Sequence, residues 1–492
     1  MSELPTCVRT AAGVRELDRI AIEEHGIPGY TLMRRAGEGA FEDLRRHWPD
    51  AGRLLIVCGA GNNGGDGYVI ARLALEQNLE ITVVSPGDTD GLKGDARTAF
   101  DDYKSAGGEV GAWAEDLPGR ADVVVDAILG TGLDRPLREN VSQIVEHINK
   151  ASAGVFAIDV PTGLNSDNGE ILGAAINADV TATFVGLKQG FYLGHGIDCT
   201  GTIEFHDLGV PPHVQDRVPC SLERIDQAVI AQALPRRPRT SHKGDSGHVL
   251  LVGGGPGLAG AILLAGSAAL EAGAGLVTVA TRPEHVELII GSRPELMCRG
   301  VEEPTDLEDL LARASVIALG PGLGQTAWAK KLFAAVIEQD CLKVLDADAL
   351  NLLAEDPMAK EKWILTPHPG EAGRLLNTSA AKIQADRLGS VTKLAEQYGG
   401  IAVLKGAGTL IAKSGVTPRV CDRGNPGMAA PGMGDVLTGV TAAVAAQYTD
   451  PVLATQAAVL IHALAGDQAA LSGERGTHAG ELLPHIRQLV NP

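Results

Sequence analysis

Short apolar runs and amphipathic stretches alternate along the chain, separated by turns rich in glycine. Residues 53–58 and 80–84 are apolar runs of strand length, whereas residues 10–24 carry apolar side chains at the three- and four-residue spacing of a helix. Strands that alternate with helices are typical of a parallel, doubly wound sheet. The pattern therefore predicts the α/β class.

The second half of the chain repeats this alternation. Apolar runs of strand length occupy residues 247–252, 315–319, 343–346, 363–365 and 401–404, and each ends in a loop of small, polar, glycine or proline residues. Because ligands of parallel sheets bind beyond the carboxyl ends of the strands, we expect these five loops to form one binding rim. Prolines and arginines at residues 211–212 and 235–239 interrupt the periodicity, which predicts a domain boundary between residues 212 and 225.

The overall charge and hydropathy exclude two classes of partner. A formal net charge of −19 and a pI near 5.1 argue against nucleic acid, whose binding requires a basic face. The most apolar stretches, residues 261–280 and 436–465, are interrupted by Glu271 and by Asp450 with Pro451. We therefore expect buried helices and strands rather than membrane spans.

The seven cysteines are scattered without CxxC spacing, and their number is odd. Such usage is typical of reduced thiols and predicts neither a disulfide framework nor a zinc site. The first residues contain no apolar segment of the kind found in secretory signals. We therefore expect a cytoplasmic protein.

A glycine-rich loop follows the first predicted strand of the sheet. Residues 59–67 read GAGNNGGDG, and helical spacing resumes at Tyr68. In the order strand, loop, helix, backbone amides and a helix N-terminus meet a phosphate group. The loop lacks the GxGxxG spacing of dinucleotide sites, but Asn62 and Asn63 supply both amide donors and neutral oxygen ligands.

Further polar residues stand at the ends of predicted strands. Asp126 and Asp159 each end an apolar run, and Thr162 follows closely. If these strands are parallel neighbours, the three residues converge with Asn63, and oxygen ligands of mixed charge suit a hard cation. The alternative is that the two aspartates only cap the turns that follow them.

The stretch GNPGMAAPGMGDVLTG, residues 424–439, is the main candidate for chemistry in the second half. Its glycines allow close approach of a ligand, and the helix that follows them begins with free N–H groups. Such donors hold a phosphate while Asp435 takes a proton from an attacking hydroxyl, which predicts phosphoryl chemistry. The alternative is a glycine-rich turn in which Asp435 is only the helix N-cap.

Two further residues lie in the predicted rim. His368 stands between two prolines, where it is either a ligand contact or an ordinary hydrogen-bonded loop residue. Lys405 ends an apolar run, where it either neutralises phosphate or is a solvated charge. No stretch has P-loop spacing, so a nucleotide would bind in another manner.

Ten motifs resemble those of one enzyme family. In the first half, GNNGGDGYVIARLA, DAILGTGL, DVPTGLNSDNGE and TFVGLKQG resemble the NAD(P)H-hydrate epimerase domain. In the second half, SHKGDSGHVLLVGG, LGPGLG, DADALNLL, LTPHPGE, VLKGAGTLIA and NPGMAAPGMGDVLTG resemble ADP/ATP-dependent NAD(P)H-hydrate dehydratase. Together they extend over nearly the whole chain, in the order found in the bifunctional NAD(P)H-hydrate repair enzymes.

The resemblance implies a Rossmann-like three-layer domain, residues 1–215, followed by a ribokinase-like α/β domain, residues 222–492. The first domain would interconvert the R and S forms of hydrated NADH or NADPH. The second would dehydrate the S form to NAD(P)H, consuming ADP or ATP and giving AMP or ADP and phosphate. The implied cofactors are K⁺ in the first domain and Mg²⁺ with the nucleotide in the second. The implied partners are these small molecules, and we expect a homo-oligomer.

The resemblance also implies site residues, position by position. In the first domain the substrate would contact Asn62, Asn63, Gly64, Gly65, Asp66, Gly130, Thr131, Gly132, Leu133, Asp134, Arg135, Pro136 and Asp159, and K⁺ would be ligated by Asn63, Asp126 and Thr162. In the second domain the substrate would contact Gly260, Ala261, Gly322, His368 and Asp435, and the nucleotide would contact Lys405, Gly406, Ala407, Gly408, Thr409 and Gly434. Asp435 would be the general base. That Asp159 moves a proton is our own hypothesis, because it is the obvious strand-end carboxylate near the ring.

Two other functions are compatible with the sequence. A ribokinase-type small-molecule kinase would phosphorylate a vitamin-like alcohol and release a stable phosphate ester. A first domain without activity would only sense a nucleotide or hold an oligomer together. The joint presence of Asn63, Asp126 and Asp159 argues against this second alternative, because a binding scaffold has no evident need for all three.

Overall fold

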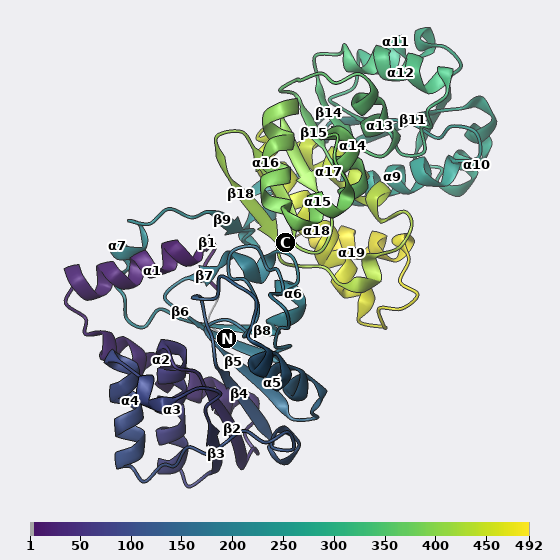
Figure 1. The fold of residues 1–492 in the computed structure, drawn as a ribbon. Helices are drawn as coiled ribbons and strands as arrows, with labels where there is room; N and C mark the ends of the chain where they lie inside the picture. The colour runs from purple at the N-terminus through teal and green to yellow at the C-terminus, as the bar shows by residue number, and fades with distance from the viewer. Residues whose placement is uncertain (1–3, 492) are drawn as a thin grey trace. The chain divides into compact units, whose positions relative to one another are not determined.

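The structure is a computed structural model that describes residues 4–491 (Figure 1). The chain divides into two compact units, which meet between Leu222 and Glu223. Each unit is built on a largely parallel sheet with helices around it. Within the described residues, no helix is both long and apolar enough to cross a membrane.

The sheet of the N-terminal unit has the order β3-β2-β4-β5-β6-β8, and all neighbouring strands are parallel. Its strands are β2 (Arg53–Cys58), β3 (Glu80–Val84), β4 (Val123–Ala127), β5 (Gly154–Ile158), β6 (Val180–Phe184) and β8 (Thr202–His206). The predicted parallel sheet is confirmed. Its consequence is that β2, β4 and β5 end side by side at one edge.

Helices cover both faces of this sheet. They are α2 (Gly29–His47), α3 (Asn62–Glu76) and α4 (Gly94–Ser105) on one face and α5 (Glu139–Lys150) on the other. Leu54 and Ile56 of β2 belong to the first apolar core, whereas Leu55 and Val57 belong to the second. Because successive side chains of a strand point to opposite faces, the unit has the predicted three layers.

The segment before this sheet belongs to the same unit. β1 (Cys7–Arg9) pairs in parallel with β7 (Leu187–Lys188), and α1 (Ala11–Arg19) continues into a π-helical turn, Ile20–Glu24. The helix predicted over residues 10–24 is therefore confirmed. Two short helices, α6 (Gly196–Cys199) and α7 (Pro212–Gln215), complete the unit.

A disulfide joins Cys7 to Cys220. The prediction that all cysteines are reduced is therefore wrong for this pair. Because 213 residues separate the two cysteines, their spacing in the sequence does not indicate the contact. The contact forms because the chain returns to β1 after the strands of the sheet, while β1 itself pairs with β7. The other cysteines, Cys58, Cys199, Cys298, Cys341 and Cys421, are free.

The sheet of the C-terminal unit is parallel through β12-β11-β10-β13-β14-β15-β16, and β17 and β18 follow in antiparallel order. Its strands are β10 (His248–Val252), β11 (Leu276–Thr281), β12 (Met297–Gly300), β13 (Val316–Leu319), β14 (Leu342–Leu345), β15 (Trp363–Leu365), β16 (Ile401–Leu404), β17 (Thr409–Lys413) and β18 (Val416–Cys421). β9 (Leu222–Arg224) pairs with β18. The five strands predicted to end in one rim, β10 and β13 to β16, are direct neighbours.

One face of this sheet forms an apolar core with α8 (Ala228–Ala233), α9 (Ala259–Glu271), α17 (Met433–Gln447), α18 (Pro451–Ala470) and α19 (Leu482–Leu489). The unit also contains α10 (Val286–Ser292), α11 (Glu308–Leu311), α12 (Ala327–Ile337), α13 (Asp348–Glu355), α14 (Pro369–Leu375), α15 (Ala380–Ala385) and α16 (Arg387–Tyr398). α12 lies against β13, and α16 lies against β16 and β17. Strand residues that alternate with members of this apolar core, such as Leu250 and Leu345, are also fully buried.

Two helices begin earlier than the sequence pattern predicts. α3 begins at Asn62, so most of the expected loop over residues 59–67 is helical. Glycine is retained there for packing: a Cβ on Gly67 would lie 2.7 Å from the Ala127 Cβ. α17 begins at Met433, and its N-cap is Gly432 in the left-handed conformation. The alternative that Asp435 is the N-cap is therefore wrong.

The disulfide predicts a specific thiol count in solution. Denatured but unreduced protein should take up five alkyl groups, because two of the seven cysteines are paired, and seven groups after reduction. Intact-protein mass spectrometry after iodoacetamide treatment measures both numbers, and a Cys220→Ser variant, with six unreduced thiols, is the control. Seven alkyl groups without reduction would contradict the pairing.

Candidate active sites

The N-terminal site lies where β2 and β4 end beside the first turn of α3. The Gly59 N–H donates to the Ala127 carbonyl (2.9 Å). A Cβ on Gly64 would lie 1.9 Å from the Gly59 oxygen, so α3 starts directly against the loop and only glycine fits. The amides of this first turn have no partner within the helix, which leaves them available to an anion.

Asp159 directly follows β5 in a strained backbone conformation. Its φ is 65°, and the Val160 N–H donates to the Ile158 carbonyl (2.8 Å), which closes a three-residue turn. A conformation of this kind costs on the order of 1–3 kcal/mol in a non-glycine residue and is typical of functional sites. The turn brings the Asp159 carboxylate to the Thr131 N–H, which donates to Oδ2 (3.1 Å).

Gly130 lies between Asp159 and Asn63. A Cβ at this position would be 2.6 Å from Oδ2 of Asp159 and 3.3 Å from Oδ1 of Asn63. The structure therefore brings together four predicted residues, Asn63, Gly130, Thr131 and Asp159. The rest of the predicted loop, residues 132–136, is largely exposed, and no side chain of this stretch bonds to Asp159 within the described residues.

Lys188, at the end of β7, is the partner of Asp159. Its side chain is fully buried, and Nζ lies 2.5 Å from Oδ1 of Asp159. The ammonium also donates to Oγ1 of Thr183 (2.7 Å) and to the Phe184 carbonyl (3.0 Å), so its three N–H groups are paired. Sequence reasoning included the motif that contains Lys188 but gave it no role. A lysine inside an apolar strand pattern was the available signal.

Two more carboxylates share the electrostatic environment of Asp159. Asp66, on α3, is buried, and burial, together with the Asp159 and Asp18 charges, raises its pKa well above the usual range. Burial raises the pKa of Asp18 to about 6, with Lys188 opposing this and Asp159 adding to it. Asp18 lies on α1 just before the π-helical turn, and sequence reasoning missed it.

The predicted cation ligands are Asp126, Thr162 and Asn63, of which Thr162 and Asp126 are in direct contact. Asp126 is fully buried, and its carboxylate accepts hydrogen bonds from the Thr162 N–H (2.7 Å) and Oγ1 (2.7 Å) and from the Ile128 N–H (3.3 Å). Burial raises its pKa to about 6, and no lysine or arginine opposes that effect. Both polar atoms of the Asn63 amide are buried without a hydrogen-bond partner.

The C-terminal site is centred on Asp346, which follows β14. Its carboxylate is 1% exposed and bonds to Nζ of Lys405 at 2.6 Å. Oγ1 of Thr366 donates to Oδ1 (3.0 Å), and Oγ1 of Thr438, on α17, donates to Oδ2 (2.8 Å). Sequence reasoning included the DADALNLL motif without assigning a role to Asp346, so this residue was missed.

The first turn of α17 stands directly over this ion pair. The first helical hydrogen bond runs from the Val436 N–H to the Gly432 carbonyl (3.0 Å), so the amides of residues 433–435 have no helical partner. A Cβ on Gly434 would lie 3.2 Å from Nζ of Lys405. Unpaired amide N–H groups and an ammonium therefore lie close together, which is an arrangement suited to bind an anion.

Asp435 lies in that same turn. Burial and then the Asp346 carboxylate raise the pKa of Asp435 to about 7, while Lys405 lowers it and Asp348 and Glu371 add to the rise. A carboxylate with a pKa near neutrality is suited to accept a proton and to release it again.

His368 has the capping role of an ordinary loop residue, and its contact with a ligand stays a prediction. Its Nδ1 accepts from the Gly370 N–H (2.9 Å), so the ring caps α14 as an ordinary loop residue would. Its side chain is nevertheless 51% exposed, and Nε2 lies 3.3 Å from Oε1 of Glu371. The solvent side of the ring remains accessible to a ligand.

The loop at residues 405–409 is held by a buried arginine. The Arg387 guanidinium donates to the carbonyls of Leu404 (3.3 Å), Lys405 (3.4 Å) and Gly408 (3.1 Å). Oγ1 of Thr409 donates to the Gly406 carbonyl (2.9 Å), which closes the turn. Sequence reasoning missed Arg387, because the arginine precedes the loop by 18 residues and acts from α16.

The remaining predicted positions lie on the same edge. The Gly322 carbonyl accepts from the Gly255 N–H (2.6 Å), and a Cβ on Gly322 would lie 3.2 Å from that of Ala261. Gly260, at the start of α9, faces open space. These small residues leave room at the rim rather than supply chemistry.

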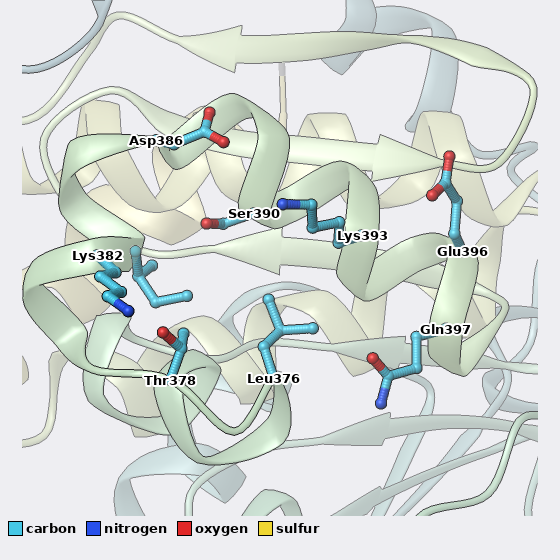
Figure 2. Close-up of a pocket in the computed structure, with 9 residues that line it drawn as sticks. Leu376, Thr378, Lys382, Asp386, Ser390, Lys393, Glu396 and Gln397 are labelled. Carbon is cyan, nitrogen blue, oxygen red and sulfur yellow. The ribbon is translucent and has the colours of Figure 1, made fainter.

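A groove of about 640 Å³ elsewhere in the C-terminal unit contains none of the predicted site residues (Figure 2). It is lined by residues that include Lys382, Asp386, Ser390 and Lys393. Within residues 4–491, no three His, Cys, Asp or Glu side chains are grouped to hold a metal.

Both halves of the chain match known families. The family described as NAD(P)H-hydrate dehydratase matches residues 249–488. The family described as YjeF-related protein N-terminus matches residues 29–190.

A curated relative and two solved structures are similar to this chain. The bifunctional NAD(P)H-hydrate repair enzyme of Coxiella burnetii is 46% identical over 480 residues, which cover 97% of this chain and 98% of that protein. A ribokinase-like superfamily protein from Enterococcus faecalis is 30% identical, with a TM-score of 0.52, and covers 55% of this chain and 98% of its own. The ADP/ATP-dependent NAD(P)H-hydrate dehydratase from Bacillus subtilis, co-crystallised with ATP and Mg²⁺, is 30% identical, with a TM-score of 0.50, over 54% of this chain and 96% of its own.

These matches confirm the ribokinase-like fold of the second half. The full-length similarity at 46% identity extends over both units and both sites. The chain therefore belongs to the family of bifunctional NAD(P)H-hydrate repair enzymes.

Proposed function

We propose that the chain epimerises the R and S forms of hydrated NADH and NADPH and dehydrates the S form to NAD(P)H, consuming ADP or ATP. Residues 1–215 are assigned to the epimerase and residues 222–492 to the dehydratase; positions 1–3 and 492 lie outside the described residues. The observation that supports this most is Asp435, a carboxylate next to free amides and the Lys405 ammonium.

In the dehydratase, residues 405–409 and Gly434 hold the nucleotide, with the α17 amides and Lys405 facing its phosphates. Asp435 accepts the proton of the ring hydroxyl as that oxygen bonds to the terminal phosphorus and AMP (or ADP) leaves. The carbon–oxygen bond then breaks, phosphate departs with its electron pair, and a proton leaves the neighbouring carbon to restore the ring double bond. Gly260, Ala261, Gly322 and His368 surround the ring.

When Mg²⁺ is bound, it would neutralise negative charge on the nucleotide. Because phosphate oxygens and water provide most ligands of this ion in nucleotide sites, the site needs no separate cage of acidic side chains. The absence of a fixed cluster within residues 4–491 is compatible with an ion that arrives on the nucleotide.

In the epimerase, residues 62–66 and 130–136 contact the hydrate, and Asp159 moves a proton at its ring. The Lys188 ammonium, 2.5 Å from Oδ1, holds the Asp159 carboxylate in place by a charge-assisted hydrogen bond. The strained turn fixes the direction of the carboxylate.

The residues at Asp126 fit K⁺. A buried carboxylate without a cationic partner and the buried, unpaired carbonyl oxygen of the Asn63 amide both gain from a monovalent cation. Asn63, Asp126 and Thr162 would hold it, and its charge would offset that of Asp126.

Self-association and a cytoplasmic location remain predictions. A sedimentation-velocity experiment tests self-association, and fractionation of cells tests the location.

The function is tested by following absorbance in the NADH band from a mixture of both hydrate epimers with Mg²⁺, K⁺ and ADP or ATP. Full, enzyme-dependent recovery of NADH supports both activities. Recovery of the S portion alone would contradict the epimerase. No recovery with either nucleotide would contradict the proposal and favour a simple kinase.

Asp159→Asn should reduce epimerisation by roughly 10²–10⁴-fold, since the carboxylate can no longer take a proton. Dehydration of the pure S form by the same chain should be unchanged, which makes it the internal control. A double variant, Asp159→Asn with Lys188→Met, removes both buried charges and controls for an unpaired ammonium. Epimerase activity at the wild-type level in either variant would contradict the assignment.

Added K⁺ should raise the melting temperature of the wild-type protein, because a ligand that binds only the folded state stabilises it, by about 2.7 kcal/mol at 100 times its Kd. Asp126→Asn should lose this response. Differential scanning fluorimetry with KCl against tetramethylammonium chloride at equal ionic strength measures both. An equal K⁺ response in the variant would exclude Asp126 as a ligand.

The dehydratase kcat/KM should rise with pH through about 7, because Asp435 acts in its ionised form and its pKa lies near that value. Asp435→Asn should abolish this rise and lower the rate by roughly 10²–10⁴-fold. Rates from pH 5.5 to 8.5 with the pure S form measure the profile, and epimerisation by the same variant controls for folding. A wild-type profile that stays flat across pH 7 would exclude Asp435 as the base.

A further inference from the structure

Asp346 joins three elements beneath the C-terminal site. Its carboxylate is 1% exposed and accepts hydrogen bonds from Thr366 after β15 (3.0 Å), Lys405 after β16 (2.6 Å) and Thr438 on α17 (2.8 Å). Three donors on one buried carboxylate leave it little freedom to move. A shift of Asp346 would therefore change the positions of Lys405 and α17 together.

We propose that Asp346 is a positioning residue of the dehydratase, which fixes the Lys405 ammonium against the first turn of α17 and so sets the charge environment in which Asp435 works. This inference rests on the proposed function of the C-terminal unit.

The place of the ammonium supports the proposal. Lysine has a flexible four-carbon stem, so a defined position for its charge requires a fixed partner. A Cβ on Gly434 would lie 3.2 Å from Nζ of Lys405 and 3.7 Å from Oδ2 of Asp346, so both charges lie directly beneath the turn that bears Asp435. The only other carboxylate in ion-pair range of the ammonium within the described residues, Glu371, is at 3.8 Å.

The charges around Asp435 come from four elements. Asp346 after β14, Asp348 on α13 and Glu371 on α14 disfavour its ionised form, and Lys405 after β16 favours it. Burial has the largest effect on the pKa of Asp435, and Asp346 has the largest effect among the charged neighbours. Replacing it by asparagine removes a negative charge and also releases Lys405 from its principal partner. The loss of the negative charge favours ionised Asp435.

The test is the pH profile of the dehydratase in Asp346→Asn. We expect the acid limb of kcat/KM to move to lower pH by roughly one unit, and the rate on the plateau to fall roughly 100-fold because Lys405 is no longer held in place. A residue with a purely structural role would lower the rate equally at every pH and leave the limb in place. An unmoved limb in a folded variant would overturn the proposal.

Thr366→Val is the matched control. It removes the hydrogen bond from Thr366 to Oδ1 of Asp346 but leaves every charge in place. We expect its acid limb to coincide with that of the wild type. A shift equal to that of Asp346→Asn would show that loss of a hydrogen bond rather than loss of charge moves the limb, and would also overturn the proposal.

A double-mutant cycle with Lys405→Met keeps the proposal testable if the single variant is poorly folded, because removing both buried charges is better tolerated than removing one. If Asp346 acts by holding Lys405, then Asp346→Asn should cost far less rate in the Lys405→Met background than in the wild type. Additive losses would overturn the proposal. Failure of the wild-type protein to form NADH would instead contradict the proposed function, so the two failures are distinguishable.

Discussion

The ion pair of Lys405 with the buried Asp346 is the interaction on which the C-terminal site depends. A buried carboxylate is tolerated only when it is paired and hydrogen-bonded, and removing the partner of a fully buried one typically costs about 3–5 kcal/mol. Here the pair is reinforced by Thr366 and Thr438, which satisfy the remaining carboxylate acceptors. The N-terminal site contains a similar ion pair, Lys188 with Asp159 at 2.5 Å, and Oγ1 of Thr183 accepts a hydrogen bond from the Lys188 ammonium.

Parallel strand order is what brings these pairs to the place where ligands bind. In the C-terminal unit, Asp346 follows β14, Thr366 follows β15 and Lys405 follows β16, and the three strands are consecutive neighbours. In the N-terminal unit, Asp126 ends β4 and Asp159 follows β5, which are also neighbours. Because all strands of each set run the same way, their carboxyl ends share one edge and their polar termini meet without any long connecting segment.

The two sites distribute charge in different ways. In the N-terminal site, carboxylates outnumber cationic side chains: Asp18, Asp66 and Asp159 lie near one ammonium, that of Lys188, and burial together with the neighbouring carboxylates raises the pKa of Asp66. In the C-terminal site, the free amides of α17 and Lys405 provide local positive potential within a chain of net charge −19. Anion binding therefore depends on local donors, because the overall field of the protein repels phosphate.

The sequence by itself determined the α/β class, the parallel sheets and the strands that end in polar loops, because burial on both faces requires continuous apolar runs that are readable one segment at a time. Residues such as Asp126, Asp159 and Lys405 were recognisable from their place at the ends of those runs, and Asp435 from its place between a glycine-rich stretch and an apolar helix. Helix starts were less accurate, since glycines within α3 are retained for close packing on β4, which no local pattern reveals.

Only the tertiary structure decided which distant residues meet. Lys188, shortly after β6, approaches Asp159 because β6 is the neighbour of β5, Arg387 reaches the loop at residues 405–409 from α16, and Cys7 meets Cys220 across 213 residues. These contacts depend on the folded path of the chain rather than on spacing in the sequence. Local patterns specify which residues end up at an edge, whereas the packing of non-adjacent segments specifies the partner that each buried charge finds there.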